Sequence, residues 1–447
     1  MQNSSLKWLI PILLCAIIIP FQSYKRGYQI PIYDARGYAS EAGTLAIFPS
    51  DEYVKAHQDG IVFPPMYPLF LKTVASFSDA AKDSLACYAK GLKTCELDDL
   101  APVFDSQIIL MTGTLFLIFL SMYFLSGSFN ISIFGLLLVL FLGKLNIYAV
   151  WLITETVAFF FFFIFIAAFA YVVSRPSRGL AYFIMGLGLA GASLTRPSYL
   201  YLCYFLVLTL PFYLLFFKKE TVAGALKNTS FLVVTLVLFI GPWIFRNYYY
   251  FDVANVSAGY GSFILAERVS YNLMTWGEYI ASFIYWLPDF GDTLAAALFP
   301  HSQYARLEFD TPDGFYLYGN TVFRQEIYAM ADTEAARMSL LLKDYVLADL
   351  FKHVMVTFTM VFRGMWVAKY FGLVGAALSI PAFLILKRSV GGWPIFYFIL
   401  PFFFMLGLNA FVSVSIPRYN MPMVCIFGLA GAVVFTHLWT WIKSKKE

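Results

Sequence analysis

Long apolar runs alternate along the chain with polar segments of very different length. A transmembrane helix needs about 20 mostly apolar residues. Runs of that kind predict ten spans, at residues 6–24, 105–125, 130–144, 152–173, 180–195, 197–217, 229–248, 369–387, 393–411 and 421–441. One or two more are compatible with residues 274–300, where Glu278, Pro288, Asp289 and Asp292 interrupt an apolar run. The pattern predicts an all-α polytopic membrane protein with about 10–12 transmembrane helices.

Two long polar segments separate these runs and divide the chain into three parts. We expect a transmembrane module at 1–248, which includes a loop at 25–104, then a second loop at 249–368, and C-terminal transmembrane helices at 369–447. In the second loop, residues 331–354 have apolar positions at helical spacing. They predict one amphipathic helix lying along the membrane interface, with an apolar face made of Met338, Leu341, Leu342, Tyr345 and Leu350.

The composition agrees with this interpretation and argues against a soluble protein and against a nucleic-acid-binding protein. Hydrophobic residues make up 60% of the chain and charged residues 13%, whereas soluble domains carry roughly 25% charged residues. The net charge of +4 is small for the 447 residues. We therefore expect a lipid bilayer as the main surrounding and no nucleic-acid partner.

The positive charges predict the orientation of the bundle, because short cytoplasmic loops are rich in Lys and Arg. With a cytoplasmic N-terminus, the cytoplasmic segments hold Lys7, Arg175, Arg178, Lys218, Lys219, Lys227, Lys387, Arg388, Lys443, Lys445 and Lys446. The opposite short loops hold only Lys144, Arg196 and Arg418. The first apolar run lacks a small-residue cleavage site, so we interpret it as an uncleaved span. Both termini are then cytoplasmic, and the two long loops are extracytoplasmic.

The five cysteines fall into two groups. Cys15, Cys203 and Cys425 lie inside apolar runs, where small buried residues are expected. Cys87 and Cys95 lie eight apart in the polar part of the first loop. They are candidates for a disulfide if that loop faces an oxidising compartment.

Five short motifs lie at the same predicted face of the membrane. Asp34-Ala-Arg-Gly-Tyr38 and Pro64-Pro-Met-Tyr-Pro68 lie in the first loop. Thr195-Arg196-Pro197, Gly241-Pro-Trp-Ile-Phe-Arg-Asn247 and Pro417-Arg-Tyr-Asn-Met-Pro422 lie at span ends. In this order they resemble the glycosyltransferase C superfamily, in the style of the bacterial lipid A aminoarabinose transferases and the protein O-mannosyltransferases. Unlike many of those relatives, the chain has Ala35 rather than an acidic residue after Asp34.

The resemblance implies a membrane enzyme that transfers one sugar from a polyprenyl-phosphate donor to an acceptor hydroxyl, with inversion at the anomeric carbon. It also implies a bacterial cytoplasmic membrane and a general base at Asp34. A phosphate leaving group is already a stable anion, so one base and nearby cations suffice for such a transfer. Asp34 could instead be a solvated loop carboxylate or a helix N-cap.

Other residues at this face are candidates for the rest of the site. Glu155, which begins a span, could orient the acceptor, pair with Arg36 or Arg196, or simply face water. Arg is suited to phosphate because its planar fork gives paired, permanently charged donors. The candidates for the donor phosphate are Arg36, Arg196, Arg246, Arg363 and Arg418, and snorkelling to the interface is the alternative for those at span ends. The candidates for contacts with a sugar or acceptor are Tyr38, Tyr67 and His57, with packing or a solvated loop as alternatives.

The sequence also bears on cofactors, on the acceptor and on alternative functions. No His, Cys or carboxylate set shows metal-ligand spacing, so we expect no obligatory metal or cofactor beyond the lipid-linked sugar. The acceptor could be a glycan, a lipid or a protein. A transporter or flippase for a lipid-linked saccharide is the main alternative, but it would carry its charges near mid-membrane. An O-antigen ligase or polymerase is another.

Overall fold

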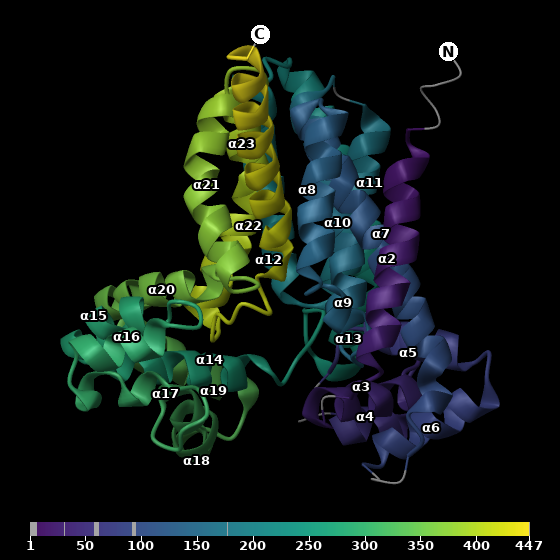
Figure 1. The fold of residues 1–447 in the computed structure, drawn as a ribbon. Coiled ribbons are helices and arrows are strands. Elements are labelled where there is room, and N and C mark those ends of the chain that lie inside the picture. The colour runs from purple at the N-terminus through teal and green to yellow at the C-terminus, as the bar shows by residue number, and fades with distance from the viewer. Residues whose placement is uncertain (1–6, 31, 58–61, 92–94, 177, 447) are drawn as a thin grey trace.

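The computed structural model describes residues 7–30, 32–57, 62–91, 95–176 and 178–446, and the side chains of residues 32–34 and 56–57 lie outside that description. In these ranges the regular structure is helical, apart from two isolated bridges, Gln29 with Trp151 and Val62 with Ala258. The helices form a bundle with two modules at one end, one from each long loop (Figure 1).

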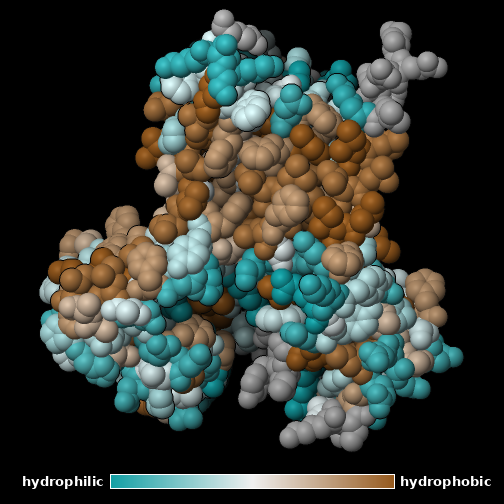
Figure 2. Space-filling model, viewed as in Figure 1, coloured by the Kyte–Doolittle hydropathy of each residue, from teal (hydrophilic) through white to brown (hydrophobic). Residues whose placement is uncertain are grey.

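Ten apolar helices form the bundle, and they match the ten predicted spans in position. Seven are long and apolar enough to cross a membrane: α2 (Leu9–Arg26), α7 (Ala101–Ser126), α10 (Glu155–Ser174), α12 (Ser198–Phe212, continued to Phe217), α13 (Val222–Phe251), α22 (Gly392–Val412) and α23 (Val424–Ser444). Three are shorter: α8 (Phe129–Leu142), α11 (Gly179–Thr195) and α21 (Tyr370–Leu386). A broad apolar belt covers the bundle in Figure 2. The chain is an all-helical polytopic membrane protein.

Glycines let two of these helices approach closely. A Cβ added to Gly191 in α11 would lie 2.2 Å from the Phe161 ring of α10, and one added to Gly188 would lie 2.4 Å from the backbone nitrogen of Phe165. Lipid supplies no hydrophobic drive between helices, so close contact through small residues is what stabilises such pairs. The pairing places the start of α10 beside the end of α11.

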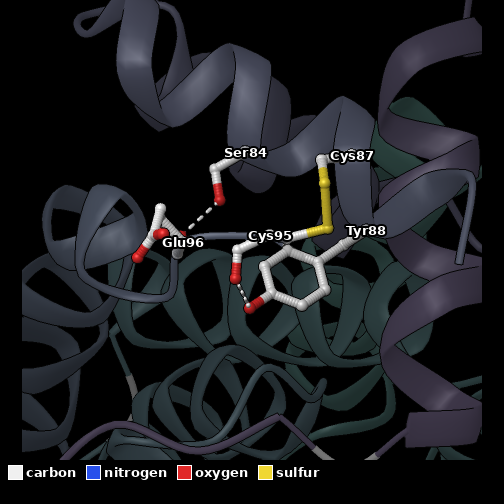
Figure 3. Close-up of a disulfide and its surroundings, with 5 residues drawn as sticks. All are labelled: Ser84, Cys87, Tyr88, Cys95 and Glu96. Atoms are coloured by element: carbon white, nitrogen blue, oxygen red, sulfur yellow. Dashed lines mark hydrogen bonds between the residues drawn. A yellow bond between two sulfur atoms is a disulfide. The ribbon is translucent and has the colours of Figure 1, made fainter. Parts of the chain in front are cut away.

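The first module is built from short helices of the first loop: α3 (Ile32–Thr44), α4 (Asp51–His57), α5 (Met66–Ala75) and α6 (Asp79–Ala89). Ala35, Ala39 and Ala42 line the buried side of α3. The end of α6 is tied down by a disulfide between Cys87 and Cys95, the pair that the sequence singled out. Figure 3 shows two hydrogen bonds beside it, from Ser84 Oγ to the Glu96 carbonyl (2.6 Å) and from Tyr88 Oη to the Cys95 carbonyl (3.2 Å).

The second module contains α14 (Gly261–Val269), α15 (Trp276–Tyr285), α16 (Gly291–Leu298), α17 (Phe315–Tyr318), α18 (Arg324–Met330), α19 (Glu334–Leu340) and α20 (Leu350–Met365). Short elements complete the described chain: α9 (Asn146–Ala149), 3-10 turns at Asp98–Leu100, Ser270–Leu273, His301–Gln303, Ala305–Leu307 and Met421–Met423, and π-helical turns at Tyr213–Phe217, Gly319–Phe323 and Leu341–Leu347.

Two expectations for this module were wrong. Residues 274–300 contain no span but two short helices, α15 and α16, of 10 and 8 residues, which is too short to cross a bilayer. Residues 331–354 are not one helix, because α19 and its π-helical continuation meet α20 at a bend of 91°. Asp349 caps the new helix by accepting a hydrogen bond from the Lys352 amide (3.0 Å).

Candidate active site

A fully buried carboxylate lies where the bundle meets the two modules. Glu155 is 0% exposed and opens α10, where the helix dipole favours a negative charge. Its Oε1 accepts hydrogen bonds from Nη1 of Arg196 (2.8 Å) and from Nε of Arg418 (2.5 Å). Of the alternatives that the sequence left open for Glu155, the structure shows the ion pair with Arg196, and the buried carboxylate does not face water. We call these three residues the Glu155 cluster.

The local sequence explains how both arginines reach Glu155. Arg196 follows the last residue of α11, and Pro197, which lacks an amide hydrogen, ends that helix before α12 begins. Arg418 lies in the turn between α22 and α23. Buried Asn420 holds this turn by accepting from Asn409 (3.0 Å) and donating to Ser415 Oγ (3.0 Å). Two of the five motifs therefore meet at one carboxylate.

The anion and the cations of the cluster differ in exposure. Two permanently charged guanidinium groups donate to the same carboxylate oxygen. The carboxylate side chain is 0% exposed, whereas the side chains of Arg196 and Arg418 are 23% and 26% exposed. The anion lies inside and the cations lie toward the open side. This arrangement favours an anion that approaches from outside the bundle.

Aromatic and amide side chains connect the cluster to the first module. The guanidinium of Arg196 lies over the ring of Tyr419, 5.0 Å from its centre. Tyr67, in α5, donates to Gln107 Oε1 (3.0 Å). Gln107 in turn donates to the carbonyl oxygens of Ala149 (3.1 Å) and Trp151 (2.9 Å), just before α10. The first module is thereby fixed relative to the helix start that holds Glu155.

Two other predicted cations, Arg36 and Arg246, make their contacts outside the cluster. Arg36 is exposed and donates to the Ala89 carbonyl at the end of α6 (3.4 Å). Arg246 is buried; it donates to the Ala46 carbonyl (3.0 Å) and covers the Trp243 ring, which ties α13 to the first module. Neither makes an ion pair among the residues that the structure describes.

Arg363, in α20, belongs to the second module. It donates to Tyr271 Oη (3.0 Å) and lies between the rings of Trp286 and Phe309, 5.1 Å from each centre. In the described ranges it has no carboxylate partner. Its surroundings are therefore aromatic, and they belong to a different part of the chain from the Glu155 cluster.

The remaining predicted residues have different outcomes. Tyr67 is 0% exposed, so its ring has no face for a sugar, and the packing alternative describes it. Tyr38 packs edge-on against Tyr67 with 5.2 Å between ring centres. The backbone of Asp34 lies in α3 and that of His57 in α4, but both side chains lie outside the described part of the structure. Their roles stay predictions.

Sequence reasoning missed three polar residues near this site. Gln107 and Asn420 position the cluster, and Gln107 had a signal: an amide inside an apolar run is costly unless it is hydrogen-bonded. Glu267, in α14, is 7% exposed, and its Oε1 has no hydrogen-bond partner in the described chain. Burial raises its pKa to about 8, although Arg324 acts in the opposite direction. Among the described residues, no group of three His, Cys, Asp or Glu is placed to hold a metal ion.

Comparisons with known proteins add little to this geometry. No family model matches the chain, and no curated protein matches it. A similar solved structure is the apo oligosaccharyltransferase of Archaeoglobus fulgidus, with a TM-score of 0.47 and 10% sequence identity. The similarity covers 98% of this chain and 52% of that one, so this chain spans about half the length of the archaeal protein.

Proposed function

We propose that the protein is an inverting membrane glycosyltransferase that uses a polyprenyl-phosphate sugar as donor. The observation that carries this proposal is the Glu155 cluster: two partly exposed guanidinium groups held on one hidden carboxylate at the module end of the bundle. A lipid-linked phosphate entering from the bilayer would meet those cations directly. The proposed location is a bacterial cytoplasmic membrane with both termini in the cytoplasm.

Each residue has a defined part in the proposed transfer. The acceptor hydroxyl oxygen attacks the anomeric carbon, and the bond from that carbon to the phosphate oxygen breaks. Asp34 takes the hydroxyl proton, and the polyprenyl phosphate leaves with the bonding electrons. Arg196 and Arg418 stabilise the charge that develops on the leaving oxygen. No general acid is needed, because the departing phosphate is a stable anion.

Glu155 has a positioning role in this scheme. A carboxylate that already accepts from two guanidinium groups is a weak base, so we assign proton removal to Asp34 and the orientation of both arginines to Glu155. Asp34 precedes Tyr38 by one helical turn in α3, and Tyr38 contacts Tyr67 beside Gln107.

The test is mass spectrometry of outer-surface glycans from cells with the gene, without it, and with Asp34→Asn. Positioned base catalysis contributes about 10²–10⁴-fold, so we expect the product to fall by that factor in the variant. Asp51→Asn, which alters an exposed carboxylate in α4 of the same module, is the matched control and should keep the product. Product formation at the normal rate by Asp34→Asn would refute the assignment of the base.

A second assay separates transfer from transport. Purified protein in nanodiscs, supplied with a radiolabelled polyprenyl-phosphate sugar and a cell-envelope extract, should release polyprenyl phosphate. A flippase moves the donor intact and releases none. A diphosphate-linked oligosaccharide, offered in parallel, tests the ligase alternative. We expect that the protein does not transfer sugar from this donor.

A further inference from the structure

The second module has an apolar face that nothing in the described chain covers. Its large exposed residues come from three helices and their flanks: Leu273, Trp276 and Ile280 from the α15 region, Leu294 and Leu298 from α16, and Leu350, Phe351, Val354 and Phe358 from α20. We call these residues the outer apolar face. Figure 2 shows apolar side chains gathered on this module next to the belt around the bundle. Contiguous exposed apolar surface of this kind marks an interaction site.

Helix α15 has the opposite distribution of polar and apolar side chains from a helix that faces water. Its fully buried positions are Glu278, Ala281 and Ser282, whereas Trp276 is 63% and Ile280 58% exposed. The buried carboxylate is satisfied by Arg306, through hydrogen bonds of 2.7 and 2.8 Å. A helix that turns its polar residues inward and its apolar residues outward matches an apolar surrounding rather than water.

Chain connectivity holds this face at the level of the membrane surface. α20 ends at Met365 and the apolar bundle helix α21 begins at Tyr370, so only residues 366–369 separate them. A linker of that length spans at most about 18 Å. In Figure 1, α20 runs across the bundle axis at the end of α21. The linker holds the Met365 end of α20 beside α21, and the direction of α20 keeps the rest of the helix at about the same level along the bundle axis.

A groove on the same face fits this position. It has a volume of about 290 Å³ and lies between the start of α15 and the start of α20, with Trp276, Phe351 and Met355 among its walls. Asp349 and Lys352 also line it. A Lys beside apolar and aromatic walls can bury its stem and reach the headgroup layer.

We infer that the outer apolar face is embedded in the lipid leaflet on the module side of the membrane. α15, α16 and α20 then form a wedge that sits in the headgroup and upper acyl layer, in the manner of interfacial helices. The occupant of the face is membrane phospholipid. This inference depends on the membrane-spanning bundle alone and stands apart from the proposed glycosyl transfer.

The test uses spin labels on single introduced cysteines at positions 280 and 351. The full chain is placed in phospholipid nanodiscs, and collisions of the label with oxygen and with a water-soluble nickel chelate are measured. The natural free cysteines, Cys15, Cys203 and Cys425, are buried, and the unmodified chain checks that they stay unlabelled. Position 330, a Met that is 62% exposed on α18 at the far end of the module, is the matched control.

The expected result is a several-fold higher ratio of oxygen to nickel collisions at positions 280 and 351 than at 330. Nickel collisions as frequent at 280 and 351 as at 330 would overturn the inference. Labels shielded from both quenchers and broadened by neighbouring spins would also overturn it, because a second copy of the chain would then cover the face.

Discussion

Two buried glutamates differ in the number of arginines with which they form ion pairs. Glu155 in the bundle is 0% exposed and shares one oxygen between Arg196 and Arg418. Glu278 in the second module is 1% exposed and uses both oxygens for a single partner, Arg306. The Glu278 pair is balanced in charge and fits the planar fork of the guanidinium. The Glu155 cluster instead places two cations on one carboxylate oxygen.

The difference separates a structural ion pair from a candidate site. Thr275 also donates to Glu278 and forms a capping box at the start of α15, so all of its contacts stabilise the helix. Burial alone raises the pKa of Glu278, but hydrogen bonds from Arg306 and Thr275 outweigh burial and hold that pKa below its ordinary value. In the Glu155 cluster both guanidinium groups are partly exposed, and we propose that their exposed sides meet the donor phosphate.

The largest expected effect is on stability, from Glu155→Gln. The change removes the carboxylate that two partly buried guanidinium groups share, and breaking a buried ion pair costs about 3–5 kcal/mol. Glu278→Gln should cost less, about 1–3 kcal/mol, because Arg306 is 39% exposed and stays hydrated. The measurement is the free energy of unfolding in detergent, obtained from denaturant titration.

A control for this comparison is Asp79→Asn, which removes an exposed ion pair with Lys82 and should change stability by at most about 1 kcal/mol. If Glu155→Gln were as mild as Asp79→Asn, the two guanidinium groups would not depend on that carboxylate, and the cluster as described would be wrong.

The next effect is on activity, from Arg418→Gln and Arg196→Gln. If these cations stabilise the leaving phosphate, removing either should lower the turnover of folded protein by on the order of 10²–10³-fold, as for other donors aimed at developing charge. Arg306→Gln, which breaks the balanced pair, should leave turnover per folded molecule unchanged. The readout is release of polyprenyl phosphate in nanodiscs, normalised to the folded fraction. Equal losses in all three variants would show that the Glu155 cluster has no special part in the reaction.

The sequence predicted much of the bundle because each span is a long apolar run, and lipid leaves few alternatives to a helix. It did not predict the bend after Leu347. Apolar spacing continues through residues 331–354, and the periodicity contains no information about direction. One signal was present: Asp349 stands three residues before Lys352, the spacing of a helix N-cap.

The candidate site was predictable as a set of residues but not as an arrangement. Arg196 and Arg418 are separated from Glu155 by 41 and 263 positions, so no local pattern pairs them. In the sequence, Arg246 and Arg363 share one feature with these two: each is a cation at or near the end of an apolar run. Only packing distinguishes them, because Arg246 bonds a carbonyl oxygen of the first module and Arg363 a tyrosine of the second.

The smallest expected effect comes from a third buried carboxylate, Glu267, whose Oε1 has no hydrogen-bond partner in the described chain. Burial raises its pKa from 4.5 to about 8, so the folded protein holds a proton there that the unfolded chain releases near pH 4.5. Its contribution to stability is therefore complete at low pH and is lost as the pH rises toward 8. From the linkage relation, the loss between pH 6 and pH 8 is about 2 kcal/mol.

Glu267→Gln removes the titration but keeps the shape of the side chain. The variant should lose about 2 kcal/mol less than the natural protein between pH 6 and pH 8, measured as the free energy of unfolding in detergent at both values. Glu278→Gln should not flatten the curve in that range, because the pKa of Glu278 already lies below its ordinary value. Parallel pH dependence of the natural protein and Glu267→Gln would mean that Glu267 is charged and partnered in the folded protein. Glu267, Glu278 and Glu155 would then no longer differ as described, with no, one and two guanidinium partners respectively.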